Sequence, residues 1–112
     1  MVVCIAPLSK FRDYIFKPGA THGKDHVFRS LGYDQTHSEE LVRIFEQQAA
    51  ARYEAKDYSV GRLNEFGQRI TIEIRLDGIG AYAEKTSWLL SGWMLQSNGS
   101  ITLNTPFAGF SR

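Results

Sequence analysis

The hydrophobic period of this sequence changes once, from a helical period in its first half to a strand period in its second. Within residues 36–54, Leu41, Ile44, Phe45 and Ala49 recur at three- and four-residue spacing, which predicts one long amphipathic helix. Within residues 69–76 every second residue is isoleucine or leucine, which predicts a half-buried strand. In a chain of 112 residues this order indicates a single α+β domain over residues 1–112.

Two shorter segments precede the long helix. Residues 8–16 carry apolar side chains at helical spacing and end in the turn signal of residues 17–19, which predicts either one short helical turn or an irregular docking arm. Residues 23–31 form the second prediction, with Gly32 just past its end and Val27, Phe28 and Leu31 on its buried face. Thr36 and Glu39 have the spacing of a capping box, so we expect them to begin the long helix.

The second half predicts three or four antiparallel strands joined by tight turns. An edge strand is expected near residues 58–60, a hairpin turn at residues 77–80, and a second turn at Asn98 and Gly99. The helices should cover one face of this sheet. The other face should carry Arg69, Thr71, Glu73 and Arg75, which is either a candidate site or an ordinary solvated face.

Composition excludes several classes of protein. Apolar residues make up 43% and charged residues 22%, as in globular domains. The lone Cys4 cannot form an internal disulfide or a zinc site of paired cysteines, and we expect it to be structural. A formal net charge of +1 is not the strong field of a general nucleic-acid coat protein, and no apolar run is long enough to span a membrane.

The segment Lys24–Tyr33 contains Phe-Arg-Ser-Leu-Gly followed by an aromatic residue. It resembles a motif in a domain of unknown function of bacterial polymorphic toxin systems. Residues 8–16 resemble that domain's first segment, residues 66–70 its glycine-glutamine-arginine strand entry, and residues 85–90 its threonine-x-tryptophan strand. The resemblance extends in order from about Leu8 to Phe107.

This resemblance implies a C-terminal toxin domain of the contact-dependent growth inhibition type. Many such domains are ribonucleases that use no metal or other cofactor, and several cleave transfer RNA. A common architecture among them is the barnase/EndoU/colicin/RelE type. The resemblance further implies a cognate immunity protein, elongation factor Tu as a possible host partner, and delivery within a larger secreted protein to the cytoplasm of a target cell.

Metal-independent RNA cleavage needs a base, an acid and a cation for the charged phosphorane. Lys24, near the start of the second helix, either points into a cleft or extends to solvent, and His26 is an acid/base candidate or a solvated residue. Arg69 and Thr86 would meet on the open sheet face if their strands pair. The alternative for Arg69 is an ion pair with a neighbouring glutamate. The predicted catalytic residues are Lys24, His26, Arg69 and Thr86.

The remaining candidates are assigned to substrate binding or to structure. The predicted substrate-binding residues are His22, Arg29, Thr71 and Arg75. His22 and His26 also have the spacing of a metal pair, but no third ligand follows, so no metal is expected. We expect Trp88 in the core and leave Trp93 open to either role.

Three functions remain open from the sequence. The first is a toxin ribonuclease, for which we expect transfer RNA as the substrate. The second, favoured by the near-zero net charge, is a non-catalytic protein-binding module such as an immunity or adaptor protein of a toxin system. The third is a small enzyme on another substrate, which no motif identifies.

Overall fold

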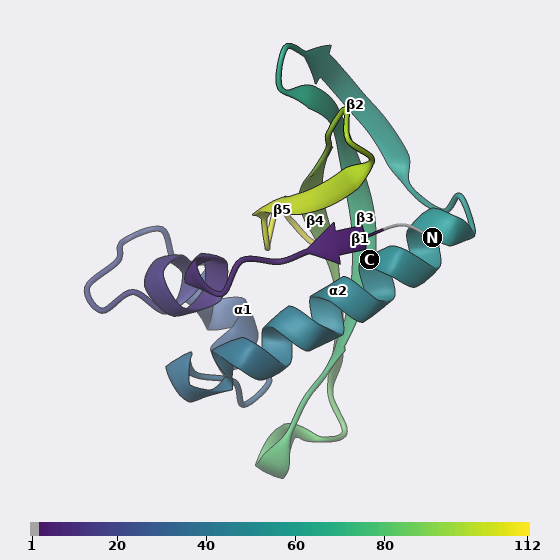
Figure 1. Ribbon diagram of the computed structural model, residues 1–112. Coiled ribbons are helices and arrows are strands. Elements are labelled where there is room, and N and C mark those ends of the chain that lie inside the picture. The colour runs from purple at the N-terminus through teal and green to yellow at the C-terminus, as the bar shows by residue number, and fades with distance from the viewer. Residues whose placement is uncertain (1–2) are drawn as a thin grey trace.

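A computed structural model describes residues 3–112 as an α+β domain built on one five-stranded sheet (Figure 1). The strand order is β1-β5-β4-β3-β2. The strands are β1 (Val3–Ile5), β2 (Ser59–Asn64), β3 (Gly67–Asp77), β4 (Thr86–Leu95) and β5 (Ser100–Thr105). The prediction of three or four antiparallel strands was wrong in two details: there are five strands, and β1 runs parallel to β5.

The alternating strand is confirmed as β3, which pairs with β4 over its whole length. Ile70, Ile72, Ile74 and Leu76 are fully buried beneath the long helix α2 (Ser38–Glu54). In Figure 1 α2 crosses in front of the strands, so the opposite face of the sheet is turned away from the viewer. We call that opposite face the open face.

Residues 8–33 form a small helical lobe beside α2. A π-helical turn, η1 (Phe11–Ile15), and the short helix α1 (Asp25–Arg29) pack their rings edge-on, with Phe11 5.0 Å from Phe45 and 6.1 Å from Phe28 between ring centroids. Gly32 ends this lobe as predicted. Its φ is +95°, and the Tyr33 N–H bonds to the Phe28 carbonyl in a Schellman arrangement.

The start of α2 and the turn after β3 differ from prediction. Thr36 does not cap α2, because a 3₁₀ turn, η2 (Gln35–His37), precedes that helix. Asp34 caps η2 instead, where its carboxylate accepts the Thr36 N–H. Residues 78–85 form a loop containing the 3₁₀ helix η3 (Gly80–Tyr82) instead of a tight hairpin. Among residues 3–112 no helix is both long and apolar enough to cross a membrane.

Two contacts complete the edges of the sheet. The side chain of Gln48 on α2 donates to the Arg75 carbonyl (2.6 Å) and accepts its N–H (2.8 Å), which satisfies the part of β3 that β2 does not reach. After β5, residues 108–111 run beside the first half of β4, where the Ser111 N–H bonds to the Trp88 carbonyl (3.0 Å). This terminal segment brings Arg112 onto the open face.

Candidate functional site

The open face carries a row of polar side chains on β3 and a mixed row on β4. Arg69, Thr71, Glu73 and Arg75 alternate with the buried residues of β3, as predicted. Strand register places each of them opposite one residue of β4; the partners are Met94, Gly92, Leu90 and Trp88 respectively. The open face therefore combines charges with an aromatic and two aliphatic side chains.

Glu73 is the centre of this face. Its Oε1 lies 3.1 Å from Nη2 of Arg112 and 3.4 Å from Nη2 of Arg52, and its Oε2 accepts the Ser111 hydroxyl. The Ser111 hydrogen bond lowers the pKa of the Glu73 carboxyl, and so do the bond and charge of Arg112 and the charge of Arg52, against the opposing effect of partial burial. Glu73 is therefore a charged carboxylate that holds two arginines in place.

Trp88 lies beside this cluster with cations over its ring. The guanidinium carbon of Arg112 is 3.7 Å from the ring centroid, and that of Arg75 is 5.7 Å from it. The prediction that Trp88 is a core residue was wrong, because its register with Arg75 turns it to the open face. The fully buried tryptophan is Trp93.

The open face is hollowed along β3. One hollow of ≈ 470 Å³ lies around Arg62, Arg69 and Thr71. A second, ≈ 290 Å³, includes Thr71, Glu73 and Tyr58, and a third, ≈ 410 Å³, lies between Arg52 and Trp88. The first two hollows share Thr71 and the last two share Asp57, so they follow one another along the strand. We call this chain of hollows the β3 groove.

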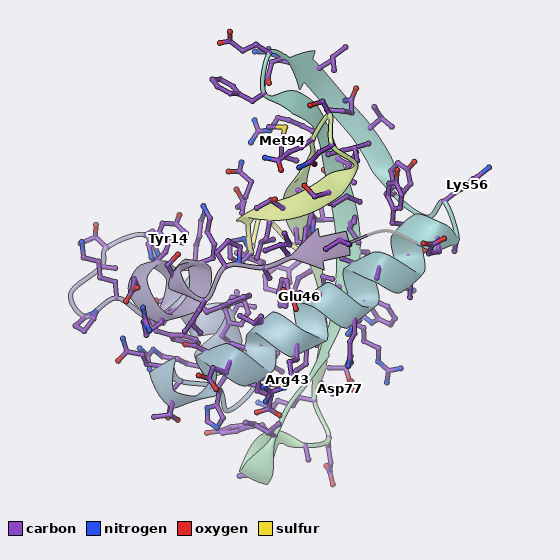
Figure 2. The ribbon with its side chains drawn as sticks, in the orientation of Figure 1. Tyr14, Arg43, Glu46, Lys56, Asp77 and Met94 are labelled. Carbon is purple, nitrogen blue, oxygen red and sulfur yellow. The ribbon has the colours of Figure 1, made fainter. Side chains whose placement is uncertain are left out.

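Four of the predicted site residues lie in the helical lobe and not in the groove; they are His22, Lys24, His26 and Arg29. His22 contacts Tyr14 through both its ring and its Nε2, which is 2.8 Å from the Tyr14 carbonyl, and the Lys24 ammonium lies 5.1 Å from the Tyr14 ring centroid. Figure 2 shows Tyr14 well apart from Met94 and Asp77, which mark the two ends of the sheet. Among the described residues, no hydrogen bond or ion pair joins this lobe group to the β3 groove.

Contacts within the lobe account for the positions of these predicted side chains. His22 Nδ1 accepts the Lys24 N–H at 2.9 Å, so both ring nitrogens are used by backbone groups. Arg29 pairs with Asp25 at 2.8 Å. His26 is exposed on α1. The structure thus keeps Lys24 and His26 together but separates them from Arg69.

Thr86 is also far from Arg69. It pairs with Asp77 in the sheet, and its hydroxyl donates to the Asp77 carboxylate at 2.8 Å. Asp77 lies eight positions after Arg69 on β3, about 26 Å at the usual strand rise. The expectation that Arg69 and Thr86 converge was therefore wrong, whereas Thr71 and Arg75 do line the β3 groove.

Sequence reasoning missed several residues of this site. Arg52, Tyr58, Arg62 and Glu73 line the groove. Ser111 and Arg112 bond to Glu73 from the end of the chain. Arg52 follows Gln48 by one helical turn, a spacing that could have shown two polar residues on the sheet-facing side of a helix. The C-terminal residues carry no pattern that predicts where they dock.

Neither a metal site nor a thiol nucleophile is apparent in the described part of the chain. No three His, Cys, Asp or Glu side chains of residues 3–112 gather as metal ligands. Burial, followed by the charges of Glu46 and Glu54, raises the pKa of the Cys4 thiol. Comparisons with models of known protein families, with curated proteins and with solved structures returned no match to this chain.

Proposed function

We propose that this domain is a ribonuclease that binds and cleaves RNA in the β3 groove without a metal ion. The observation that carries the proposal is the cluster in which one carboxylate, Glu73, meets two arginines beside an accessible tryptophan. Guanidinium groups bind phosphate through two hydrogen bonds, and an aromatic ring stacks an unpaired base. The groove therefore offers the two contacts that a single strand of RNA requires.

In the proposed reaction Glu73 is the base. A phosphodiester that enters the cluster takes over Arg52 and Arg112 as partners and leaves a carboxylate oxygen free. Glu73 then accepts the proton of the 2′-hydroxyl, the 2′-oxygen bonds to phosphorus, and the bond from phosphorus to the 5′-oxygen breaks. We assign the proton for the leaving 5′-oxygen to the phenol of Tyr58, which lines the same hollow. The products are a 2′,3′-cyclic phosphate and a 5′-hydroxyl.

The biological setting of this proposal is a bacterial toxin. The motif resemblance supports transfer RNA as the substrate, the cytoplasm of a competing cell as the place of action, and a cognate immunity protein as partner. Such a partner would block the groove with an acidic surface, because arginines lie along it. Elongation factor Tu is the host partner to include in an assay.

The test is incubation of the purified domain with total bacterial RNA in excess EDTA, with and without elongation factor Tu, on a denaturing gel. We expect discrete transfer-RNA fragments that end in cyclic phosphate. Glu73→Gln should lower the cleavage rate by about 10²–10⁴-fold, the contribution typical of a general base. Intact RNA in every lane, from domain shown to be folded, would overturn the proposal.

Glu39→Gln is the matched control. Glu39 is an exposed carboxylate in the first turn of α2, on the helix side of the sheet. This variant removes the same charge as Glu73→Gln and should cleave RNA at the wild-type rate. Equal losses in both variants would show that overall charge, not the Glu73 site, controls cleavage.

A second candidate function, a non-catalytic protein-binding module, is favoured by the tip of the β2–β3 hairpin. Val60, Leu63 and Phe66 are 66%, 72% and 71% exposed there. Adjacent exposed apolar side chains often mark a protein contact. Two results together would favour this function. The folded domain would neither cleave RNA nor slow bacterial growth, and it would no longer bind a purified cognate partner after Leu63→Ser and Phe66→Ser substitution.

A further inference from the structure

A β-bulge lies in the β2–β3 hairpin at one end of the groove. Val60 pairs with Ile70 and Leu63 with Gln68, so Gly61 and Arg62 together stand opposite Arg69 alone. The Gln68 side chain donates to the Gly61 carbonyl at 2.6 Å, which satisfies a group that the bulge takes out of the ladder. Bulges re-aim side chains. Here Arg62 and Arg69 both line the first hollow of the groove.

These two arginines differ from the arginines near Glu73 and Trp88 in having no counter-charge. Arg52, Arg75 and Arg112 each pair with a carboxylate. Among residues 3–112, neither Arg62 nor Arg69 has a side-chain hydrogen bond or an ion pair, and no acidic residue lines their hollow. Two like charges that line one hollow without a carboxylate repel each other, so an anion bound in that hollow would relieve the repulsion.

The floor of the same hollow is shaped to admit a small group. Thr71, Gly92 and Thr105 lie in one row across β3, β4 and β5. Because Gly92 has no side chain, the middle of the row is low, and a Cβ there would lie 3.5 Å from the Thr105 Cβ. Two threonines thus flank a dip whose rim carries the two arginines.

We propose that this hollow is a phosphate-binding subsite, in which Arg62 and Arg69 grip one phosphodiester of a nucleic-acid strand and the hydroxyls of Thr71 and Thr105 donate to it. Guanidinium forks and hydroxyls fit phosphate oxygens. Arg69 lies four residues before Glu73 on the same face, about 13 Å along β3. The subsite rests on the proposed function: it holds the RNA strand beyond the bond that is cleaved, and so selects an oligonucleotide over a dinucleotide.

The test measures binding apart from cleavage. A fluorescent RNA oligonucleotide with 2′-O-methyl sugars cannot form a 2′-oxygen nucleophile, so its polarisation reports affinity alone, in EDTA and at several salt concentrations. Arg62→Gln and Arg69→Gln should each weaken binding about tenfold and lower the salt slope by about 0.7, the value for one phosphate contact on a single strand. A dinucleotide should bind all variants equally weakly.

Arg43→Gln is the matched control, since Arg43 is an arginine on the exposed side of α2 with no partner among the described residues (Figure 2). It should bind like wild type. Losses in Arg62→Gln and Arg69→Gln no larger than in this control, or no binding by wild type, would overturn the subsite. If the wild-type domain cleaves RNA and both variants bind as tightly as wild type, the subsite is wrong and the ribonuclease proposal stands. If both variants lose binding as expected but the wild-type domain cleaves no RNA, the ribonuclease proposal is wrong and the subsite stands.

Discussion

The two tryptophans of β4 lie five residues apart and on opposite faces of the sheet. Trp93 is buried beneath α2, and its indole N–H donates to Ser91, whose hydroxyl donates in turn to the Ile72 carbonyl at 2.7 Å. Trp88 is half-buried on the open face with two guanidinium groups over its ring. One face thus satisfies its polar groups internally, whereas the other keeps its aromatic ring and its charges within reach of a ligand.

This difference shows how one strand can serve stability and binding at once. The helix side depends on close packing, so a change in the volume of one of its side chains lowers stability. The open face depends on charge pairs near solvent, which contribute little to folding. Substitutions on the two faces should therefore differ in kind: the helix side affects the free energy of unfolding, and the open face affects what the domain binds.

The largest expected contrast is between the tryptophans themselves. Trp93→Ala should lower the free energy of unfolding by about 3–5 kcal/mol, because it leaves a large cavity in the core. Trp88→Ala should lower it by less than about 1 kcal/mol while weakening RNA binding, since one stacked base contributes about 1–3 kcal/mol. Urea unfolding and the polarisation assay measure the two effects. Equal destabilisation by both variants would contradict the division between the faces.

A smaller contrast concerns hydroxyl groups. Ser91→Ala leaves the buried Trp93 N–H and the Ile72 carbonyl without their partner, which should cost about 1–3 kcal/mol of unfolding free energy. Thr86→Val removes the exposed hydrogen bond to Asp77 and should cost less than about 0.5 kcal/mol. Thermal unfolding of the two variants gives the comparison, and a Thr86 cost as large as that of Ser91 would speak against it.

Acid should act on one tryptophan and not on the other. The pKa of Glu73 is lowered in the folded domain, so its bonds to Ser111 and Arg112 are intact above the ordinary glutamate pKa, about 4.3, and are lost as pH falls through the lower folded value. The free-energy change should stay below about 1 kcal/mol. The indole NMR signal of Trp88 should shift in this window while that of Trp93 stays fixed, and Glu73→Gln should remove the shift.

The smallest expected effect is none at all. Lys24→Ala and His26→Ala lie in the helical lobe, outside the β3 groove, and should leave RNA affinity and cleavage rate at wild-type values. The polarisation assay gives the RNA affinity, and the denaturing-gel assay in EDTA gives the cleavage rate. Loss of cleavage in either variant, with the fold intact, would return the catalytic site to the residues first predicted from the sequence.

The parts of the fold that follow from local pattern were predictable. The alternation from Arg69 to Leu76 fixes which side chains of β3 face the core, because side chains in a strand alternate. Gly32 ends the helical lobe because only a residue without a Cβ fits there: a Cβ would lie 2.7 Å from the Ile79 carbonyl. Both features depend on a single segment and its immediate chemistry.

The parts that depend on distant partners were not predictable. Residues 86–95 have apolar side chains on both parities, so only their register with β3 shows that Trp88 and Trp93 face opposite ways. The strand β1 has three residues and exists through its parallel pairing with β5. The candidate site also depends on residues that are distant in the sequence, since Arg52 reaches Glu73 from a helix and Arg112 reaches it from the end of the chain.

The amide of Gln48 has a consequence for the behaviour of the domain in concentrated solution. Unpaired backbone groups along a sheet edge are a template on which a second chain can add a strand and begin an aggregate. By bonding to both the N–H and the carbonyl of Arg75, this one side chain occupies the place where such a strand would start. Gln48, which also lines the third hollow of the β3 groove, therefore blocks strand addition at this point of the sheet edge.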